Sequence, residues 1–192
     1  MKQHSGLAST IAIIAAAAMM SSCSEEPAPN STESPSPPIS TSATPHPSEN
    51  FNTEQLEATA TLIKYYRVRD EVYSSIDADP QPLKDITTGE MQTLQLDVLE
   101  SNREIGIVLK GFTVVHLLGA STPEDVNGVR TVTVQVCVDD SNIDAIDSNT
   151  GESGMVVSRI QYMKESINVI RTEDGWKVGD GVSEEIVSEC PN

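Results

Sequence analysis

Helical spacing of apolar residues begins just after residue 50. Asn52 followed by Gln55 is the pattern of a capping box, and Glu54 places negative charge in the first turn, where the helix dipole favours it. The apolar positions that continue this spacing are Leu56, Ala60, Ile63, Tyr66 and Tyr73. The pattern predicts a helix over residues 53–76, ended by the polar, proline-containing segment 77–82.

A second capping signature, Thr87 followed by Glu90, opens another predicted helix. Its apolar positions, Met91, Leu94, Val98 and Ile105, fall on one face, as in an amphipathic helix.

Strand patterns replace helical spacing after Gly106. Residues 107–118 are rich in Val, Leu and Phe and predict a strand with a bulge at Gly111, followed by a turn over residues 121–128. Residues 130–139 then alternate cleanly, which predicts a strand with one apolar face. Val132, Val134, Val136 and Val138 point one way, and Thr131, Thr133, Gln135 and Cys137 point the other.

A third long strand is predicted over residues 156–171. Its apolar residues change from even-numbered to odd-numbered positions near Lys164 and Glu165. This change of side indicates a bulge or a sharp bend there. Asp174 and Gly175 then form a predicted hairpin turn. The predicted helices come first in the sequence and the antiparallel strands follow. This order predicts an α+β domain over residues 51–192, with the helices on one face of a curved antiparallel sheet.

The segment before this domain divides into two parts. Residues 1–22 contain a short apolar run and read as a secretory signal peptide. They end in Met20-Ser21-Ser22-Cys23, which resembles the lipobox of bacterial lipoproteins and predicts lipidation of Cys23. The alternatives are an ordinary signal peptide cleaved nearby or an apolar core helix. Residues 23–50 are rich in Pro, Ser and Thr and predict a disordered tether.

The net charge of the chain limits the classes of partner that it can bind. The 192 residues include 29 Asp and Glu against 12 Lys and Arg, a formal net charge of -17. A nucleic acid would be repelled by this balance, and attachment to anionic lipid through a basic patch is disfavoured for the same reason. Most of the acidic residues belong to the predicted domain, so cationic or neutral partners are expected.

Several of these segments together resemble a known class of proteins. They are Lys64-Tyr65-Tyr66-Arg67, the second helix, Val134-Gln135-Val136-Cys137-Val138-Asp139, and Asp174-Gly175-Trp176-Lys177-Val178 followed by Cys190. They look like small secreted lipoproteins of actinobacteria with a nuclear transport factor 2-like domain. The resemblance implies a cone-shaped α+β fold and a lipid-anchored location, and it carries no catalytic signature.

Three cysteines are an odd number for an exported chain. With Cys23 as the lipid anchor, Cys137 and Cys190 remain, and an oxidising compartment makes a disulfide between them the default. The alternatives are two free buried thiols or a metal pair, although no Cys/His spacing supports a metal. The disulfide would pin the C-terminal tail over the polar face of the strand that carries Cys137.

The resemblance also suggests where a pocket would lie. The superfamily includes isomerases and dehydratases that use Asp, Tyr and His inside the cone. Candidate pocket residues here are Tyr65, Tyr66, Asp70, His116, Tyr162 and Trp176. The competing interpretation is that the tyrosines belong to the core and that His116, the one histidine of the predicted domain, is a packed or surface residue. No catalytic residue is assigned.

An oxygen-rich segment from Asp139 to Asn149 suggests calcium. However, Ala145 stands where an EF-hand loop requires glycine, and Gly151 stands where it requires a bidentate Glu. A solvated acidic loop is the better prediction, and no metal or other cofactor is expected.

Two function classes follow. The first is a membrane-anchored lipoprotein on the extracytoplasmic face of the cell membrane, whose non-enzymatic domain binds an envelope protein or acts as a scaffold for it. The alternative is a small-molecule binder or an isomerase- or dehydratase-type enzyme that uses the cone interior, with an unknown ligand. An interior in which Trp176, Phe112 and the valine face pack solidly favours the first, and a deep pocket lined by Tyr and Asp favours the second.

Overall fold

The computed structural model describes residues 47–155 and 159–191. The predicted signal peptide, Cys23 and most of the predicted tether lie outside the described residues. The last four residues of that tether, Pro47–Asn50, form a 3-10 helix, η1. The first described element therefore begins before residue 51, the predicted domain boundary.

Helix α1 spans Thr53–Tyr73 and begins where the sequence predicts. The Asn52 side chain accepts a hydrogen bond from the Gln55 amide (3.0 Å), and the Gln55 side chain accepts one from the Asn52 amide (2.9 Å). The predicted capping box is thereby confirmed. The helix ends three residues before the predicted end, where the Ser74 hydroxyl donates to the Glu71 carbonyl (2.7 Å) and satisfies an acceptor of the last turn.

The buried face of α1 differs in part from the predicted one. Leu56 is 47% exposed and Ile63 is 37% exposed, although the helical spacing included both. The buried side chains of α1 are Gln55, Ala58, Thr59, Leu62, Tyr65, Tyr66, Val68, Val72 and Tyr73. Because α1 carries apolar residues on more than one side, periodicity alone does not select the face that the sheet covers.

Two further helices follow. The short helix α2, Gln81–Ile86, was not predicted, because Pro80 and Pro82 read as stop signals; Pro82 lies in its first turn, where a missing amide is tolerated. Helix α3 spans Gly89–Glu104 and has Thr88 as its N-cap. The Thr87 hydroxyl instead donates to the Leu83 carbonyl (2.6 Å) at the end of α2.

The apolar positions predicted along the second helix are mostly exposed. Leu94 is 56% exposed, Val98 37% and Ile105 69%, whereas Leu99 is the one buried residue of α3. An amphipathic helix normally buries its apolar face, and here that expectation is wrong.

The predicted strand over residues 107–118 is two strands in different sheets. β1 (Ile107–Lys110) pairs with β5 (Asp144–Asp147), and β2 (Val114–Ala120) joins the main sheet. Gly111 separates them with a φ of +102°, so it marks a break and not a bulge. β5 forms within the segment predicted as an acidic loop, where β1 supplies its hydrogen-bonding partner.

The main sheet is antiparallel and has the order β2-β4-β6-β7, with β3 paired to the start of β4. Its remaining strands are β3 (Glu124–Val126), β4 (Val129–Asp139), β6 (Tyr162–Thr172) and β7 (Gly175–Ile186). Asn127 and Gly128, both with positive φ, form a tight hairpin turn between β3 and β4. The predicted hairpin turn joins β6 to β7 but lies one residue earlier than predicted, at Glu173 and Asp174, because Gly175 already pairs with Thr172. The β6 register shifts lie at residues 166–169, slightly beyond the predicted bend.

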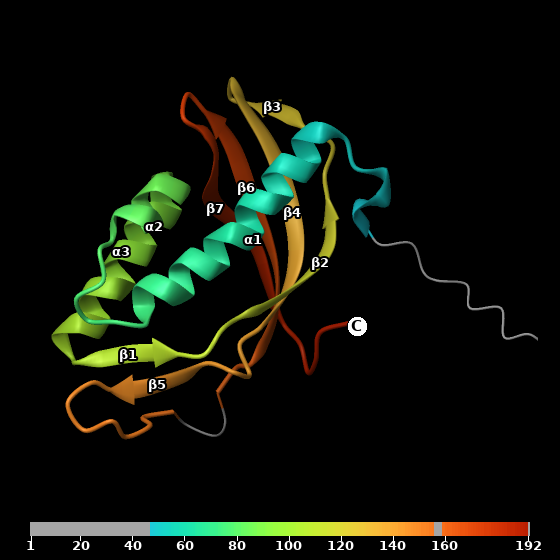
Figure 1. The fold of residues 1–192 in the computed structure, drawn as a ribbon. Coiled ribbons are helices and arrows are strands. Elements are labelled where there is room, and N and C mark those ends of the chain that lie inside the picture. The colour runs from blue at the N-terminus through green and yellow to red at the C-terminus, as the bar shows by residue number, and fades with distance from the viewer. Residues whose placement is uncertain (1–46, 156–158, 192) are drawn as a thin grey trace, which may run out of the picture. The chain divides into compact units, whose positions relative to one another are not determined.

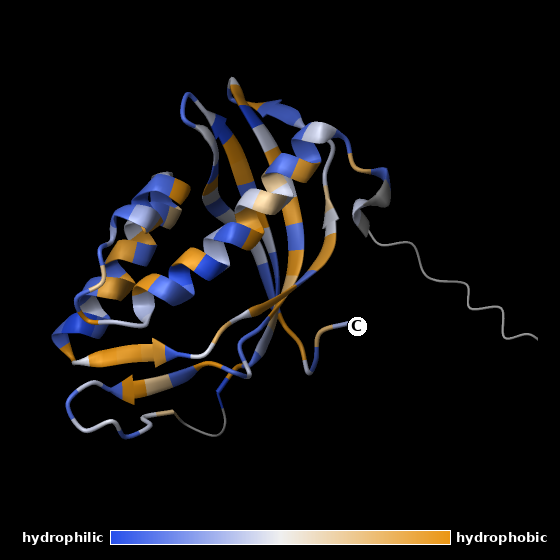
Figure 2. Ribbon diagram, viewed as in Figure 1, coloured by the Kyte–Doolittle hydropathy of each residue, from blue (hydrophilic) through white to orange (hydrophobic). Residues whose placement is uncertain are grey.

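The helices lie on one face of this curved sheet (Figure 1). α1 crosses the face diagonally, and α2 and α3 lie beside it near β7. The four valines predicted to share one face of β4 are all buried, at 0–2% exposure, against α1 and its neighbours. Figure 2 shows the resulting alternation of apolar and polar bands along the strands. The predicted α+β class is confirmed.

Candidate functional site

The structure divides the six predicted pocket residues among three places. Tyr65, Tyr66 and Asp70 lie on the part of α1 that faces the sheet. Trp176 is buried in the core near the first turns of α1, where its indole donates to Glu57 (2.9 Å).

His116 and Tyr162 lie on the opposite face of the sheet. His116 pairs with Cys137 on β4, and Tyr162 pairs with Asp139. Residues 137 and 139 alternate with the buried valines of β4, so their partners point away from α1. The structure therefore does not bring His116 or Tyr162 to the tyrosines of α1.

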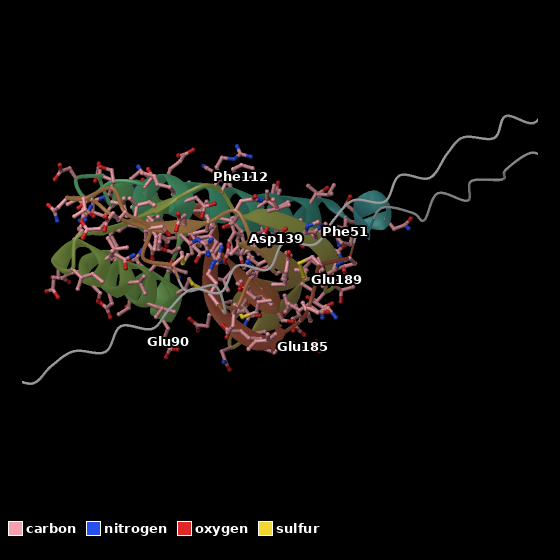
Figure 3. The ribbon with its side chains drawn as sticks, turned by 90° about the horizontal axis from the view of Figure 1, so that it is seen from below. Phe51, Glu90, Phe112, Asp139, Glu185 and Glu189 are labelled. Carbon is pink, nitrogen blue, oxygen red and sulfur yellow. A yellow bond between two sulfur atoms is a disulfide. The ribbon has the colours of Figure 1, made fainter. Side chains whose placement is uncertain are left out.

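Tyr66 and Asp70 line a groove of about 550 Å³ between α1 and the β1–β2 connection. Its other lining residues are Ile63, Arg67, Glu71, Ser74, Gly111, Phe112, Thr113 and Val115. Phe112 is 62% exposed, and Figure 3 shows it at the edge of the domain beside α1. An aromatic side chain left so exposed beside a groove is a feature of binding surfaces.

Two residues that line this groove, Asp70 and Thr113, pair with Arg69 and Asp140, and these four residues are called the floor. Asp70 accepts the Thr113 amide (2.7 Å) and lies 3.0 Å from the Arg69 guanidinium. The Thr113 hydroxyl contacts Asp140 (2.6 Å), which itself lies 3.4 Å from Arg69. Burial alone lowers the pKa of Arg69, but the carboxylates of Asp140 and Asp70 outweigh it and raise that pKa above its ordinary value. The floor thus joins α1, the β1–β2 connection and the end of β4.

Tyr66 links this floor to the sheet. Its hydroxyl donates to Glu165 of β6 (2.5 Å), and the Arg69 guanidinium lies 5.0 Å from the centre of its ring, within cation–π range. Burial raises the pKa of Glu165, and burial together with the Glu165 charge raises the pKa of Tyr66. Tyr66 therefore remains a protonated donor at neutral pH.

The polar residues around the groove differ in whether they already have partners. Asp70 and Tyr66 already hold partners within the fold, and Glu165 does not line the groove wall. What faces the open space is Phe112, Ile63 and the opposite charges of Arg67 and Glu71. Within residues 47–155 and 159–191, no cluster of three or more His, Cys, Asp or Glu is placed to hold a metal ion.

Sequence reasoning missed Arg69, Thr113, Asp140 and Glu165. The sequence held one signal for Glu165: it continues the alternation of Ile167 and Val169, which places a charged residue on the apolar face of the strand. The register confirms this, because Glu165 pairs with Val136. The predicted bulge or bend has its counterpart in the register shifts at residues 166–169, and the Tyr66 hydrogen bond satisfies the Glu165 carboxylate just before them. Nothing local to the sequence links Arg69 to Asp140.

The predicted cysteine pair is joined. Cys137 and Cys190 form a disulfide with an S–S distance of 2.04 Å, and Cys137 is fully buried. The Val187 amide donates to the Tyr162 carbonyl (3.2 Å) where the tail leaves β7. The tail is thus fastened over the sheet face that carries His116 and Tyr162.

Comparisons with known proteins do not assign a family. No protein-family model matches the sequence, and no curated protein matches it. Among solved structures, the intermembrane space region of the chloroplast protein ARC6 is similar with a TM-score of 0.48 and 12% identity, over 69% of this chain and 97% of that chain. The putative transfer protein TraH from the Gram-positive conjugative plasmid pIP501 is similar with a TM-score of 0.42 and 13% identity, over 72% and 100%.

The fold and the groove define the structural class of the domain. It is an α+β domain with helices on one face of an antiparallel sheet, a disulfide-fastened tail and a surface groove beside α1. Among the described residues, no helix has the length and apolar character needed to cross a bilayer.

Proposed function

We propose that the domain is the non-enzymatic binding module of a lipid-anchored extracytoplasmic protein, and that the groove beside α1 receives an envelope protein. In this proposal Cys23 carries the lipid, and residues 23–46 tether the domain to the outer face of the cell membrane. The lipobox-like ending of residues 1–22 and the Cys137–Cys190 disulfide support an oxidising location.

One observation carries the binding role. Phe112 is 62% exposed at the rim of a groove whose acidic and basic floor residues are already paired with one another. A catalytic site needs groups that are free to exchange protons with a substrate, whereas a docking site needs exposed apolar area with polar surroundings. The buried valines of β4 and Trp176 fill the space behind α1, which also supports binding at the surface. Phe112 does not pack with them as the non-enzymatic interpretation expects, because it is exposed beside the groove.

The finer fold assignment belongs to the same proposal. Helices packed across one face of a curved antiparallel sheet support a nuclear transport factor 2-like domain. The acidic balance of the chain supports a cationic or neutral protein partner and opposes nucleic acid.

Metabolic labelling with radioactive palmitate tests the anchor. The full chain, expressed in a bacterium, is expected to incorporate label and to sediment with membranes, and Cys23→Ser is expected to lose both properties. Cys190→Ser, which changes a cysteine of the domain, serves as the matched control and should keep the label. Equal labelling of the Cys23→Ser chain would exclude the anchor.

A photoreactive phenylalanine analogue at position 112 tests the groove. We expect one discrete protein adduct in the intact envelope, and its loss when Ile63→Glu places a charge on the facing wall. The same analogue at Val129, which is 38% exposed on β4, is the control and should not give this adduct. An adduct that is equally strong from both positions, or that survives Ile63→Glu, would contradict docking in the groove.

The small-molecule or enzyme alternative rests on Tyr66 and Glu165. The groove volume of about 550 Å³ suits a small ligand, and a carboxyl group with a raised pKa hydrogen-bonded to a tyrosine is a recognised acid–base arrangement. Under this alternative, Tyr66→Phe abolishes ligand binding or turnover while leaving the adduct at position 112 unchanged. Under the docking proposal, Tyr66→Phe has no functional effect beyond stability.

A further inference from the structure

Helix α3 leaves an apolar stripe open to solvent. Leu94 is 56% exposed, Val98 37% and Ile105, its C-cap residue, 69%. With about 3.6 residues per turn, positions 94, 98, 101 and 105 fall on one line along the helix. Three of these four residues are large and aliphatic, and Ser101 is the fourth.

The stripe is not required for the core of the domain. α3 packs inward through another side: Leu99 is 3% exposed, and the Tyr73 hydroxyl donates to Gln95 (2.8 Å). Tyr65 approaches the sulfur of Met91 (3.6 Å) from the same inner side. The helix therefore has a buried face of its own in addition to the exposed stripe.

Acidic side chains run beside the stripe at heptad spacing. Glu90, Asp97 and Glu104 lie seven residues apart, along one edge of the line formed by Leu94, Val98 and Ile105, and all three are exposed. The helix has a single basic residue, Arg103, and its guanidinium donates to the Ala78 carbonyl. The exposed apolar stripe thus has a negative edge with no cation of α3 turned toward it.

This pattern is the one that a helix presents to a partner helix. In helix pairs, apolar residues at 3-4 spacing form the seam, and charges at the flanking positions select the partner. We propose that the α3 stripe is a docking surface for an amphipathic helix of a partner protein that carries Lys or Arg beside its own apolar seam. This surface is separate from the groove: Figure 3 shows Glu90 and Phe112 at opposite edges of the domain.

Charge argues for this occupant over two others. A second copy of the chain offers its own α3 with three acidic residues at the same positions and no available cation, so the edge would stay unmatched. An anionic membrane surface would be repelled by the same edge. A helix with basic flanks satisfies both the apolar and the charged part of the surface.

Two designed helical peptides test the proposal. They share one apolar seam, and the flanking positions are all Lys in the first and all Glu in the second. Binding to the full chain is measured by fluorescence anisotropy at low salt. We expect the Lys peptide to bind at least about tenfold more tightly than the Glu peptide, with a difference that shrinks as salt is added. Equal binding of the two peptides, or binding of neither, overturns the proposal.

Variants of the chain locate the binding. Leu94→Ser is expected to weaken binding of the Lys peptide at least about tenfold, since it removes a large, exposed apolar contact at the N-terminal end of the stripe. Leu56→Ser, at a leucine 47% exposed on α1, is the matched control and should not change the affinity. Circular dichroism of both variants shows whether the fold is kept. Unchanged affinity in a folded Leu94→Ser chain overturns the assignment.

Reversing the charge of the acidic residues beside the stripe tests the role of charge most directly. The double variant Asp97→Lys/Glu104→Lys should exchange the preference, so that the Glu peptide becomes the tighter ligand. Retained preference for the Lys peptide overturns the charge argument. Self-association of the native chain that Leu94→Ser abolishes, or binding to phosphatidylglycerol vesicles that the same change abolishes, would instead assign the stripe to a second copy or to a membrane and overturn the proposal.

These outcomes are independent of those for the groove. Phe112→Ser leaves peptide binding unchanged if α3 is the docking surface, and Leu94→Ser leaves the adduct at position 112 unchanged if the groove binds its own partner. Failure of one proposal is therefore distinguishable from failure of the other.

Discussion

Arg69 is the charge around which the floor of the groove is organised. Its side chain is only 17% exposed, and a guanidinium placed there is tolerated because Asp70 and Asp140 lie on either side of it. The two carboxylates come from α1 and from the end of β4, and Thr113 touches both of them. Side chains from three segments thus depend on one another for their hydrogen bonds.

Removal of Asp70 should be costly. Asp70→Ala leaves Arg69 with a single carboxylate partner, Asp140 at 3.4 Å, beside its contacts with the Thr113 hydroxyl and the Tyr66 ring. It also leaves the Thr113 amide without its acceptor. We expect the free energy of unfolding to fall by roughly 3 kcal/mol, as when one member of a buried ion pair is deleted. Urea denaturation measures it. Glu185→Ala is the control, because its pair with Lys164 is exposed and should contribute less than about 0.5 kcal/mol. Equal losses in the two variants would contradict a cooperative floor.

Glu165 should make stability depend on pH. Because its pKa is raised in the folded state above an unfolded value near 4.5, its stabilising contribution is fully present below that pH and is lost as pH rises through the folded pKa. Glu165→Gln stays neutral throughout and keeps an acceptor for Tyr66. We expect the variant to match the native chain in urea midpoint at low pH and to exceed it increasingly above pH 4.5. A difference that is constant with pH would show that the carboxyl is not perturbed.

At the scale of elements, Gly111 decides where β1 ends. A Cβ built there would meet the Asn142 carbonyl oxygen at 1.9 Å, and the backbone has a φ of +102°. The chain can therefore pass from the β1–β5 ribbon to the main sheet only where no side chain intervenes. This passage places Phe112 and Thr113 against α1.

Substitution of Gly111 tests that passage. Gly111→Ala combines left-handed backbone strain with a backbone collision, and we expect it to lower the free energy of unfolding by about 3 kcal/mol or more. Gly151→Ala is the matched control, because Gly151 also has a positive φ (+76°) but nothing within 4 Å of its Cβ position. It should cost only about 1 kcal/mol. Thermal or urea unfolding compares them, and similar losses would mean that the close approach to Asn142 is relaxed without cost.

The elements that the sequence predicts well are those with local causes. The capping box of α1 and the alternating valines of β4 are set by neighbours a few residues apart, and both are confirmed. β5 was missed because its pairing depends on β1, more than thirty residues earlier. The buried side of α3 was misjudged because the helix has two apolar faces, and only the packing of Tyr65 and Tyr73 against it selects one.

At the scale of the whole domain, the disulfide fastens the end of the chain to the middle of the sheet. Cys190→Ser opens a loop with a sequence separation of 53 and should lower the free energy of unfolding by up to about 4 kcal/mol, by the entropy of the unfolded chain. Reductant should destabilise the native chain by a similar amount and leave Cys190→Ser unchanged. Urea unfolding with and without reductant measures both. A native chain that is insensitive to reductant would contradict this account.

The candidate site was predictable in part. The resemblance to a superfamily that uses Asp, Tyr and His inside its cone points to Tyr66 and Asp70, and both line the groove. His116 and Tyr162 were grouped with them on residue type alone. Strand register places these two on the other side of the sheet, because alternation along β2 and β6 follows their pairing with β4.

The sequence by itself determined the α+β class, the start of α1 and the apolar face of β4, because each follows from local spacing or from the order of the elements. It favoured the pairing of Cys137 with Cys190 only with Cys23 set aside as the predicted anchor. Only the tertiary structure decided that residues 107–118 part into two sheets, that Arg69 lies between two carboxylates, and that Phe112 and the α3 stripe stay exposed. Those outcomes depend on which distant segments pack against one another. The free energy of burying apolar area decides between alternative packings, and it depends on the whole packed domain rather than on any short stretch of chain.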